Sequence, residues 1–219
     1  MRHPLMRVAL PGLLIFAAAT PGSAGDTKAA APNPGKTAPY RQPKDSRQPK
    51  GSVLFDQGPT TGGNGGCWSN FTESQNFAEQ ATLASPVEVT SMNIYTCIGP
   101  QGGTIHIKVL DDDGAGNPST FLYQEDRVPD AWVPDPTSGG FLVTVNLATP
   151  FLASAGTTYW YGVSGNGFEL GQFSVLTPGN GTMAQFQGSV FDHHTTVGDQ
   201  MFQLLGSVVP VELLSVTVE

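Results

Sequence analysis

Basic side chains are almost missing from most of this chain. From Gly51 onward only Lys108 and Arg127 are basic, against sixteen acidic residues, whereas residues 25–50 alone hold six lysines and arginines. A surface this acidic repels the phosphates of nucleic acids, which excludes nucleic acid as a partner. Cations, basic partners and neutral ligands remain compatible with it.

Cysteine is also scarce, since the chain holds only Cys67 and Cys97. Neither has histidine or carboxylate neighbours at the spacing of a metal site. Two cysteines in one domain of an oxidising compartment most often pair, which predicts a disulfide that closes a loop of 30 residues. Such a loop stabilises the fold by roughly 3.6 kcal/mol in the chain-entropy model. The alternative is two unpaired buried thiols.

Long hydrophobic runs are missing, with one short exception at the start of the chain. Arg2 and Arg7 precede the apolar run Val8–Ala19, and small residues follow it at positions 22–24. This pattern predicts a signal peptide over residues 1–24 and hence a protein that is secreted or placed at the cell surface. The run is too short to span a bilayer, and no later stretch approaches 18 apolar residues. No transmembrane segment is expected in the mature chain.

Residues 25–52 contain five prolines and almost no large apolar side chain. Such a segment cannot bury enough surface to offset its ordering entropy, which predicts a disordered, partly extended linker. Its basic charge suits either electrostatic attachment to an anionic envelope or a passive spacer.

Helical periodicity is absent from the rest of the chain, and a period of two replaces it. Apolar and polar residues alternate over 105–109, 141–147, 159–163 and 202–204. Weaker strand candidates are 53–56, 76–83, 87–97, 120–127, 168–176 and 183–188, with a slip in 87–97 that predicts a β-bulge. Glycine- and proline-rich turns separate the strands. The pattern predicts an all-β, antiparallel two-sheet β-sandwich, jelly-roll-like, over residues 53–206, followed by a C-terminal tail at 207–219.

The order of these segments resembles the jelly-roll domains of bacterial exported proteins that often carry C-terminal sorting tails. The similarity lies in the strands VTSMNIYTC and FLVTVNLATPFLASAGTTYWYGVSG, the turn in IKVLDDDGAGNPSTFLY and the closing QMFQLLG. The ending VPVELLS is also similar to a segment found near such sorting regions. The resemblance implies an exported sandwich domain and no particular activity.

The turn at residues 111–118 is the strongest candidate for an ion site. Asp111, Asp113 and Asn117 occupy the first, third and seventh places of a calcium-loop pattern, with glycine at the sixth place. Leu122 stands where a bidentate glutamate is needed, so a calcium site here requires a distant third acid. The alternative is a solvated hairpin loop.

Catalytic signatures are absent. The segment Gly162-Val163-Ser164 begins a nucleophile-elbow pattern, but Asn166 stands where its last glycine belongs. A glycosidase needs only two opposed carboxylates, and one sequence does not show whether any two face each other. No catalytic residue is predicted.

Aromatic residues give the best indication of binding. Trp132 and Asp130 lie in a proline-flanked segment without other large apolar side chains, and Trp68 lies beside Cys67. Exposed tryptophan rings next to polar groups hold sugar rings in many β-sandwich modules. We therefore predict Trp132, Trp68 and Asp130 as ligand-binding residues, with core packing as the alternative.

These observations predict an exported, non-catalytic β-sandwich module with a structural or interaction role. Its partners would be neutral polysaccharide or a surface protein. The first alternative is a carbohydrate-binding module assisted by calcium, and the second is a glycan-active enzyme.

Overall fold

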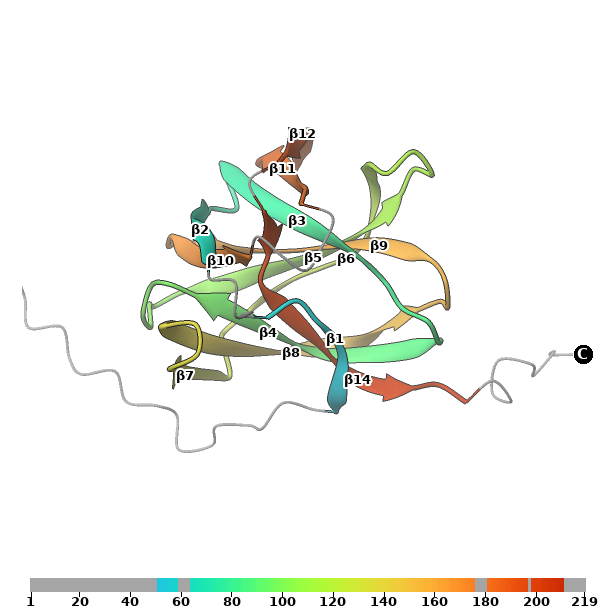
Figure 1. Ribbon diagram of the computed structural model, residues 1–219, viewed down its shortest axis with the longest axis horizontal. Coiled ribbons are helices and arrows are strands. Elements are labelled where there is room, and N and C mark those ends of the chain that lie inside the picture. The colour runs from blue at the N-terminus through green and yellow to red at the C-terminus, as the bar shows by residue number, and fades with distance from the viewer. Residues whose placement is uncertain (1–50, 59–63, 176–180, 197, 211–219) are drawn as a thin grey trace, which may run out of the picture. The chain divides into compact units, whose positions relative to one another are not determined.

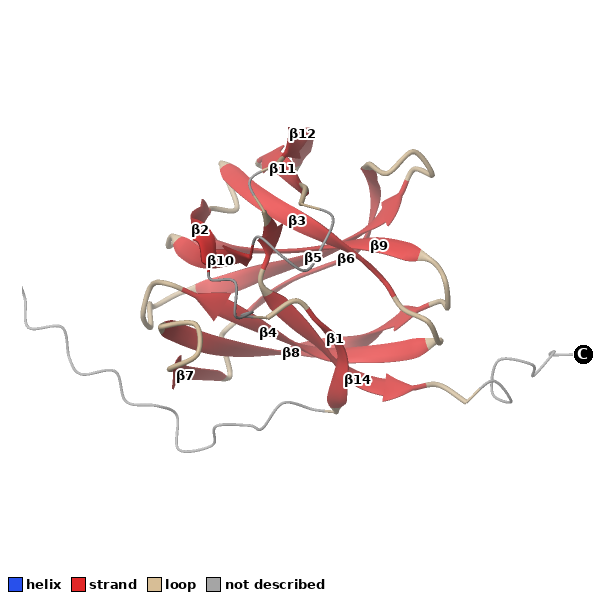
Figure 2. Ribbon diagram, in the orientation of Figure 1, coloured by secondary structure: helices blue, strands red, loops and turns tan. Residues whose placement is uncertain are grey.

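The computed structural model describes residues 51–58, 64–175, 181–196 and 198–210. Within these ranges the chain forms strands and no helix, arranged as two antiparallel sheets (Figures 1 and 2). The predicted all-β sandwich is confirmed. The signal peptide at 1–24, nearly all of the linker at 25–52 and most of the tail at 207–219 lie outside the described residues.

Fourteen strands follow one another along the described chain. They are β1 Ser52–Asp56, β2 Asn64–Asn70, β3 Gln75–Thr82, β4 Val87–Thr96, β5 Thr104–Asp112, β6 Pro118–Arg127, β7 Ala131–Asp135, β8 Gly140–Ala153, β9 Thr158–Asn166, β10 Leu170–Val175, β11 Met183–Gln187, β12 Val190–Thr195, β13 Asp199–Gln200 and β14 Phe202–Val208.

The strands divide into a sheet of eight and a sheet of six. In the first, sheet A, β4 lies between β14 and β8 and also touches β10; β1 and β7 extend the two flanks, while β2 and β13 pair with β10. In the second, sheet B, the order is β12-β11-β3-β9-β5-β6. Most neighbours are therefore distant in the chain, as expected for a sandwich with crossing connections.

The main hydrophobic core lies between the two sheets. Alternate residues of β5 and β9, such as Ile107 and Tyr161, meet alternate residues of β4 and β8, such as Ile94 and Val145. All four of these side chains are at most 2% exposed. The period of two in the sequence is thus the consequence of one face of each strand turning toward the core.

The predicted bulge in the fourth strand is confirmed. The pairing of β4 with β8 and with β14 skips Thr90, because the register shifts between Val89 and Ser91 on both sides. One extra residue in the strand moves the apolar positions to the other parity, which is why the alternation slips in the sequence.

Sheet B also buries part of its outer face. Ala78, Leu110 and Trp160 form a second apolar cluster there with Phe186 and Ala184 of β11. The indole nitrogen of Trp160 donates a hydrogen bond to Asp112 Oδ2 at 2.9 Å. The middle parts of β3, β5 and β9 are therefore covered on both faces, and this second cover shelters polar side chains as well as apolar ones.

The predicted disulfide is present. Cys67 of β2 and Cys97, directly after β4, are bonded with their Cα atoms 6.0 Å apart. Both segments also pair with β10, so the bond closes one end of sheet A.

Candidate functional site

The structure places Trp132 in the core and not on the surface. It lies in β7, where it pairs with Val143 of β8, and its side chain is 3% exposed within the main core. The prediction of an exposed ring at Trp132 is wrong. Trp132 is buried because β8 is long enough to pair with β7. The sequence of β7 lies near prolines and is typical of a loop, so this pairing was not expected.

The other two predicted ligand-binding residues serve contacts within the fold. Trp68 is half-buried; its indole nitrogen donates to Ser174 Oγ at 3.1 Å and its ring meets Phe77 edge-on. Asp130 accepts a hydrogen bond from the backbone nitrogen of Asn146 at 2.8 Å. These contacts hold β2 to β10 and the start of β7 to β8.

The carboxylate groups of the acidic turn after β5 accept hydrogen bonds from within the turn itself. Asp113 accepts three of them, from the backbone nitrogens of Ala115 and Asn117 and from Asn117 Nδ2. These bonds, those of Asn117 above all, lower the pKa of Asp113. Asp111 accepts from the backbone nitrogen of Asp112 instead. In the described part of the chain, no group of three or more histidines, cysteines or acids is placed to hold a metal ion.

A small polar cavity lies on the outer face of sheet B, and we call it the outer-face cleft. Its volume is about 40 Å³, which suits a single functional group rather than a whole ligand. Strands β3, β5, β6 and β9 supply most of its wall, and the turn between β11 and β12 closes one side. The lining residues are Thr72, Asn76, His106, Lys108, Phe121, Gln124, Ser164, Gly188 and Ser189.

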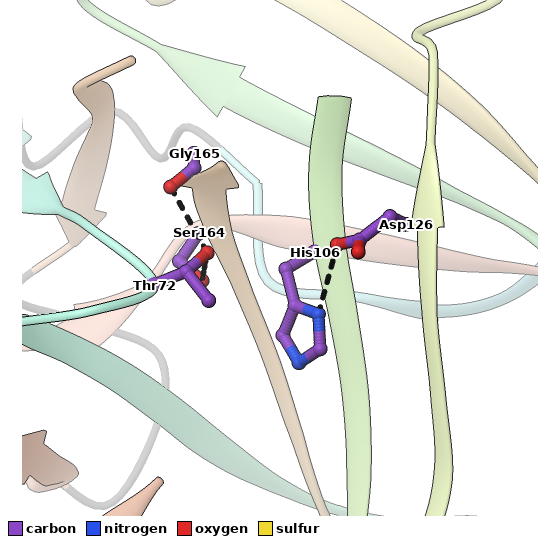
Figure 3. A network of polar contacts seen from close by, with 5 residues as sticks. All are labelled: Thr72, His106, Asp126, Ser164 and Gly165. Atoms are coloured by element: carbon purple, nitrogen blue, oxygen red, sulfur yellow. Dashed lines mark hydrogen bonds and ion pairs between the residues drawn. The ribbon is translucent and has the colours of Figure 1, made fainter. Parts of the chain in front are cut away.

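The rim of the cleft carries an imidazole held by a carboxylate. His106 of β5 pairs across the sheet with Asp126 of β6 on one side and with Ser164 of β9 on the other. Its Nδ1 lies 3.0 Å from Asp126 Oδ1, and the histidine side chain is 19% exposed (Figure 3). The carboxylate therefore fixes the ring, which leaves Nε2 as the nitrogen free of that contact.

Ser164 faces His106 across the sheet but gives its proton elsewhere. Its Oγ lies 3.0 Å from Thr72 Oγ1, and Thr72 Oγ1 also lies 3.0 Å from the carbonyl oxygen of Gly165 (Figure 3). A carbonyl only accepts, so the single Thr72 proton goes to Gly165, and Ser164 must be the donor to Thr72. The serine is also 1% exposed. This arrangement differs from an activated nucleophile, whose hydroxyl proton is directed at a base.

Lys108 forms the floor of the cleft. Its side chain is 2% exposed, its Nζ donates to Asn76 Oδ1, and the same nitrogen lies 3.6 Å from the centre of the Phe186 ring. Burial lowers the pKa of Lys108 to about 7. The salt bridges among the described residues do not include this lysine, so its cationic form has no ion-pair partner there.

A second buried charged group lies on the opposite face of β3, and we call it the inner cluster. It consists of Asn70, Glu79, Gln172, Asp199 and Gln200, each at most 2% exposed. Glu79 accepts hydrogen bonds from the backbone nitrogens of Gln80 at 2.9 Å and Gln200 at 3.2 Å. Burial, followed by the charge of Asp199, raises the pKa of Glu79 to about 9. This cluster joins sheet B to sheet A through the core.

Sequence reasoning missed the outer-face cleft because His106 and Lys108 are the polar positions of the alternating segment 105–109, and polar positions of such a segment are ordinarily solvated. One signal was available: Leu110 has the same parity as Lys108, and Trp160 and Gly162 occupy the matching positions of β9. A large apolar residue and a glycine on that parity indicate that the face is covered, so a lysine between them is buried.

A larger hollow of about 240 Å³ lies where β8 and β4 meet the end of β14. Its lining is Pro86, Val87, Leu152, Ala153, Ser154, Ala155 and Val209, without an ionisable side chain. It offers apolar surface and no group for acid–base or metal chemistry.

No protein-family model, no curated protein and no solved structure matches the chain. The described residues also include no helix long and apolar enough to cross a membrane. A functional conclusion therefore rests on the geometry of the outer-face cleft.

Proposed function

We propose that this protein is an exported, non-catalytic β-sandwich module with an interaction role, and that it contacts its ligand at the outer-face cleft. The observation that supports this is a row of hydrogen-bonding side chains, His106, Gln124, Ser164 and Thr72, beside the ring of Phe121 in one cavity. Polar groups next to an apolar ring are the usual composition of a ligand site.

Neutral polysaccharide is the ligand class that fits best. The domain from Gly51 onward carries sixteen acids against two bases, so it disfavours anionic polymers. A cavity of about 40 Å³ takes one projecting group, such as a hydroxymethyl, while the rest of a sugar chain lies along the sheet. Each contact is then weak, and useful affinity requires several sites on one polymer.

Export is proposed on the signal-peptide pattern of residues 1–24, together with the disulfide. Disulfides persist in oxidising compartments and are rare in the reducing cytosol. Fractionation of cells that express the full chain tests this: the mature chain should begin near Gly25 and be found outside the cytoplasm. An uncleaved chain that stays in the cytoplasm would contradict it.

The alternative of a glycan-active enzyme has less support. Glycosidases act through two carboxyl groups on either side of the scissile bond, and the lining of the cleft includes no aspartate or glutamate. Asp126 does not line the cleft, and its Oδ1 is in contact with His106 Nδ1 at 3.0 Å.

A glycan array followed by pull-down on insoluble polysaccharide tests the binding proposal. His106→Ala and Gln124→Ala should each reduce retention of the protein by about fivefold or more, as expected for a lost hydrogen bond of about 1 kcal/mol.

His193→Ala is the matched control, because His193 forms the same 3.0 Å contact with an aspartate, Asp192, but does not line the cleft. Its retention should equal that of the unmodified protein. If no neutral glycan is retained, or if all three variants behave alike, the cleft is not the binding site.

A further inference from the structure

The side chain of Lys108 crosses a neighbouring strand to reach Asn76. Lys108 of β5 pairs with Gly162 of β9, and Gly162 pairs in turn with Ala78 of β3. A Cβ atom at Gly162 would lie 2.4 Å from Lys108 Cε and 3.0 Å from Lys108 Cγ. The lysine therefore lies flat over β9 in space that only a glycine leaves open, and its amine arrives at β3.

Asn76 is held so that its carbonyl group faces this amine. Its Nδ2 donates toward three carbonyl oxygens, those of Phe71 at 3.1 Å, Ser74 at 2.9 Å and Gly188 at 3.0 Å. An amide nitrogen only donates and an amide oxygen only accepts, so the nitrogen must face the carbonyls and the oxygen must face Lys108. The orientation of the amide is thus fixed by the structure around it.

The three carbonyl oxygens exceed what an amide nitrogen needs. A side-chain amide carries two N–H groups, whereas ammonia carries three, so three acceptors match a departing ammonia better than a resident amide. The same site holds the amine of Lys108 against the carbonyl group of Asn76.

We propose that Lys108 and Asn76 become joined by an isopeptide bond between the lysine amine and the asparagine side chain, which ties β5 to β3 across β9. This bond is independent of the proposed binding function, since its formation requires no ligand.

The reaction balances without another reactant. The lone pair of the neutral Lys108 Nζ attacks Asn76 Cγ, and a bond forms between these two atoms. One proton moves from Nζ to Nδ2, the bond between Cγ and Nδ2 breaks, and ammonia leaves between the three carbonyl oxygens. The product is a secondary amide, and nothing is oxidised or reduced.

The surroundings favour this reaction over a permanent ion. A lysine becomes nucleophilic when burial destabilises its charged form, and burial lowers the pKa of Lys108 to about 7, so both forms are present at neutral pH. His106, Thr72 and Ser164 line the same cavity as Lys108 and Asn76. The hydroxyl groups of Thr72 and Ser164 are hydrogen-bonded to each other (Figure 3), and we assign the relay of the proton to these hydroxyl groups and to His106. Formation of the amide removes a buried cation that has no ion-pair partner among the described residues.

Mass spectrometry of the purified full chain tests the proposal. Under denaturing conditions its intact mass should be lower than the mass of the processed sequence with its disulfide by one ammonia. Proteolysis should release a branched peptide in which the segments around Asn76 and Lys108 are joined, and fragmentation should locate the bond at these two residues.

Lys108→Met and Asn76→Ala should both restore the mass expected from sequence and abolish the branched peptide completely. Arg127→Met is the matched control, because Arg127 is the other basic side chain of the sandwich and is not part of the site; it should retain the mass loss. The masses are read on denatured protein, but the bond forms only in the folded chain, so Arg127→Met must first be shown by its melting curve to fold.

An unmodified intact mass in the parent chain, with separate peptides for Asn76 and Lys108, would overturn the proposal and leave a hydrogen bond only. A loss of ammonia that persists in Lys108→Met would overturn it as well, since the change would then come from another asparagine.

Discussion

The two faces of β3 handle buried charge in opposite ways. On the inner face, Glu79 lies among polar partners, with two backbone nitrogens as donors and the acid Asp199 nearby. On the outer face, three residues away along the same strand, Asn76 meets Lys108. At neutral pH, Glu79 keeps a proton that it would lose in water, because burial raises its pKa to about 9. Lys108 tends to lose a proton that it would keep in water, because burial lowers its pKa to about 7.

The difference shows how surroundings decide the outcome of burial. A carboxyl group that takes up a proton becomes a neutral hydrogen-bonding group, and the polar groups around Glu79 can hydrogen-bond to it without any further reaction. A lysine that gives up its proton becomes a nucleophile, and here its amine contacts the side-chain carbonyl group of Asn76. Desolvation therefore favours a neutral, hydrogen-bonded carboxyl group on the inner face and a neutral, nucleophilic amine on the outer face.

The largest expected effect is a fall in stability with rising pH caused by Glu79. Its folded pKa of about 9 lies above its ordinary value of 4.5, so between these values the folded state binds more protons than the unfolded state. The free energy of unfolding then falls by about 1.4 kcal/mol per pH unit from this group, or about 4 kcal/mol between pH 5 and pH 8. Urea titrations across this range measure it, and Glu79→Gln should remove most of the decline. An equal decline in that variant would assign it to other groups.

The same titrations, continued to higher pH, distinguish the two faces. A free Lys108 with a folded pKa of about 7, below its ordinary 10.5, binds fewer protons folded than unfolded, so stability from this group would rise with pH between 7 and 10.5. That rise would offset the decline from Glu79 between pH 7 and pH 9. A lysine joined to Asn76 does not titrate. The difference between the parent chain and Lys108→Met should therefore be independent of pH, and a rising difference would indicate a free amine.

A smaller change in the free energy of unfolding is expected at pH 5 when the inner cluster loses the carboxyl group of Glu79. Glu79→Ala leaves the backbone nitrogens of Gln80 and Gln200 without the oxygens they bond, at a cost of about 2–3 kcal/mol. The loss should disappear and then change sign before pH 8, because the parent chain loses about 4 kcal/mol over this range and the alanine variant, which has no group to titrate, does not. Gln80→Ala is the control on the other face of β3, with an expected change under about 0.5 kcal/mol. Equal losses in both variants would show that the network contributes nothing specific.

Gly162→Ala tests the path of the lysine on the outer face. The added methyl group would lie 2.4 Å from Lys108 Cε and 2.8 Å from the carbonyl oxygen of Phe77, so side chain and backbone must both shift. Overpacking of this kind lowers the free energy of unfolding by about 2 kcal/mol. It should also reduce the yield of the joined peptide. Gly102→Ala, where a methyl group meets nothing within 4 Å, is the matched control and should leave stability within about 0.5 kcal/mol. If both variants retain full stability and full cross-linking, Lys108 does not lie over Gly162.

Alternation in the sequence was sufficient to predict the sandwich, because strands such as β5 and β8 turn one clear face to the main core. The bulge at Thr90 was visible for the same reason, since it changes the parity of that face. The disulfide followed from having two cysteines only.

What alternation could not show is a second covered face. A hairpin of two strands, β11 and β12, extends sheet B and shelters polar positions of β3 and β5. Residues there alternate as solvated ones do, so the pattern predicts an exposed Lys108 although it is 2% exposed. The prediction for Trp132 was wrong for a related reason. Strand β8, which buries it, follows a turn and pairs with β7 although β7 contains a proline. Burial by distant strands is a property of the topology and not of the local sequence.

The smallest effect on the free energy of unfolding is expected for a substitution at the rim of the outer-face cleft. Such a substitution distinguishes a role in binding from a role in stability. Asp126 is 47% exposed and its contact with His106 is an open ion pair, so Asp126→Asn should change the free energy of unfolding by less than about 0.5 kcal/mol. The substitution also replaces the charged acceptor that orients the imidazole with a neutral amide that can donate as well as accept, so retention on a neutral polysaccharide should fall while the melting curve stays in place. Asp192→Asn, the same change in the exposed pair with His193, should alter neither property. A drop in stability with unchanged retention would give the Asp126–His106 pair a structural role and remove it from the proposed binding site.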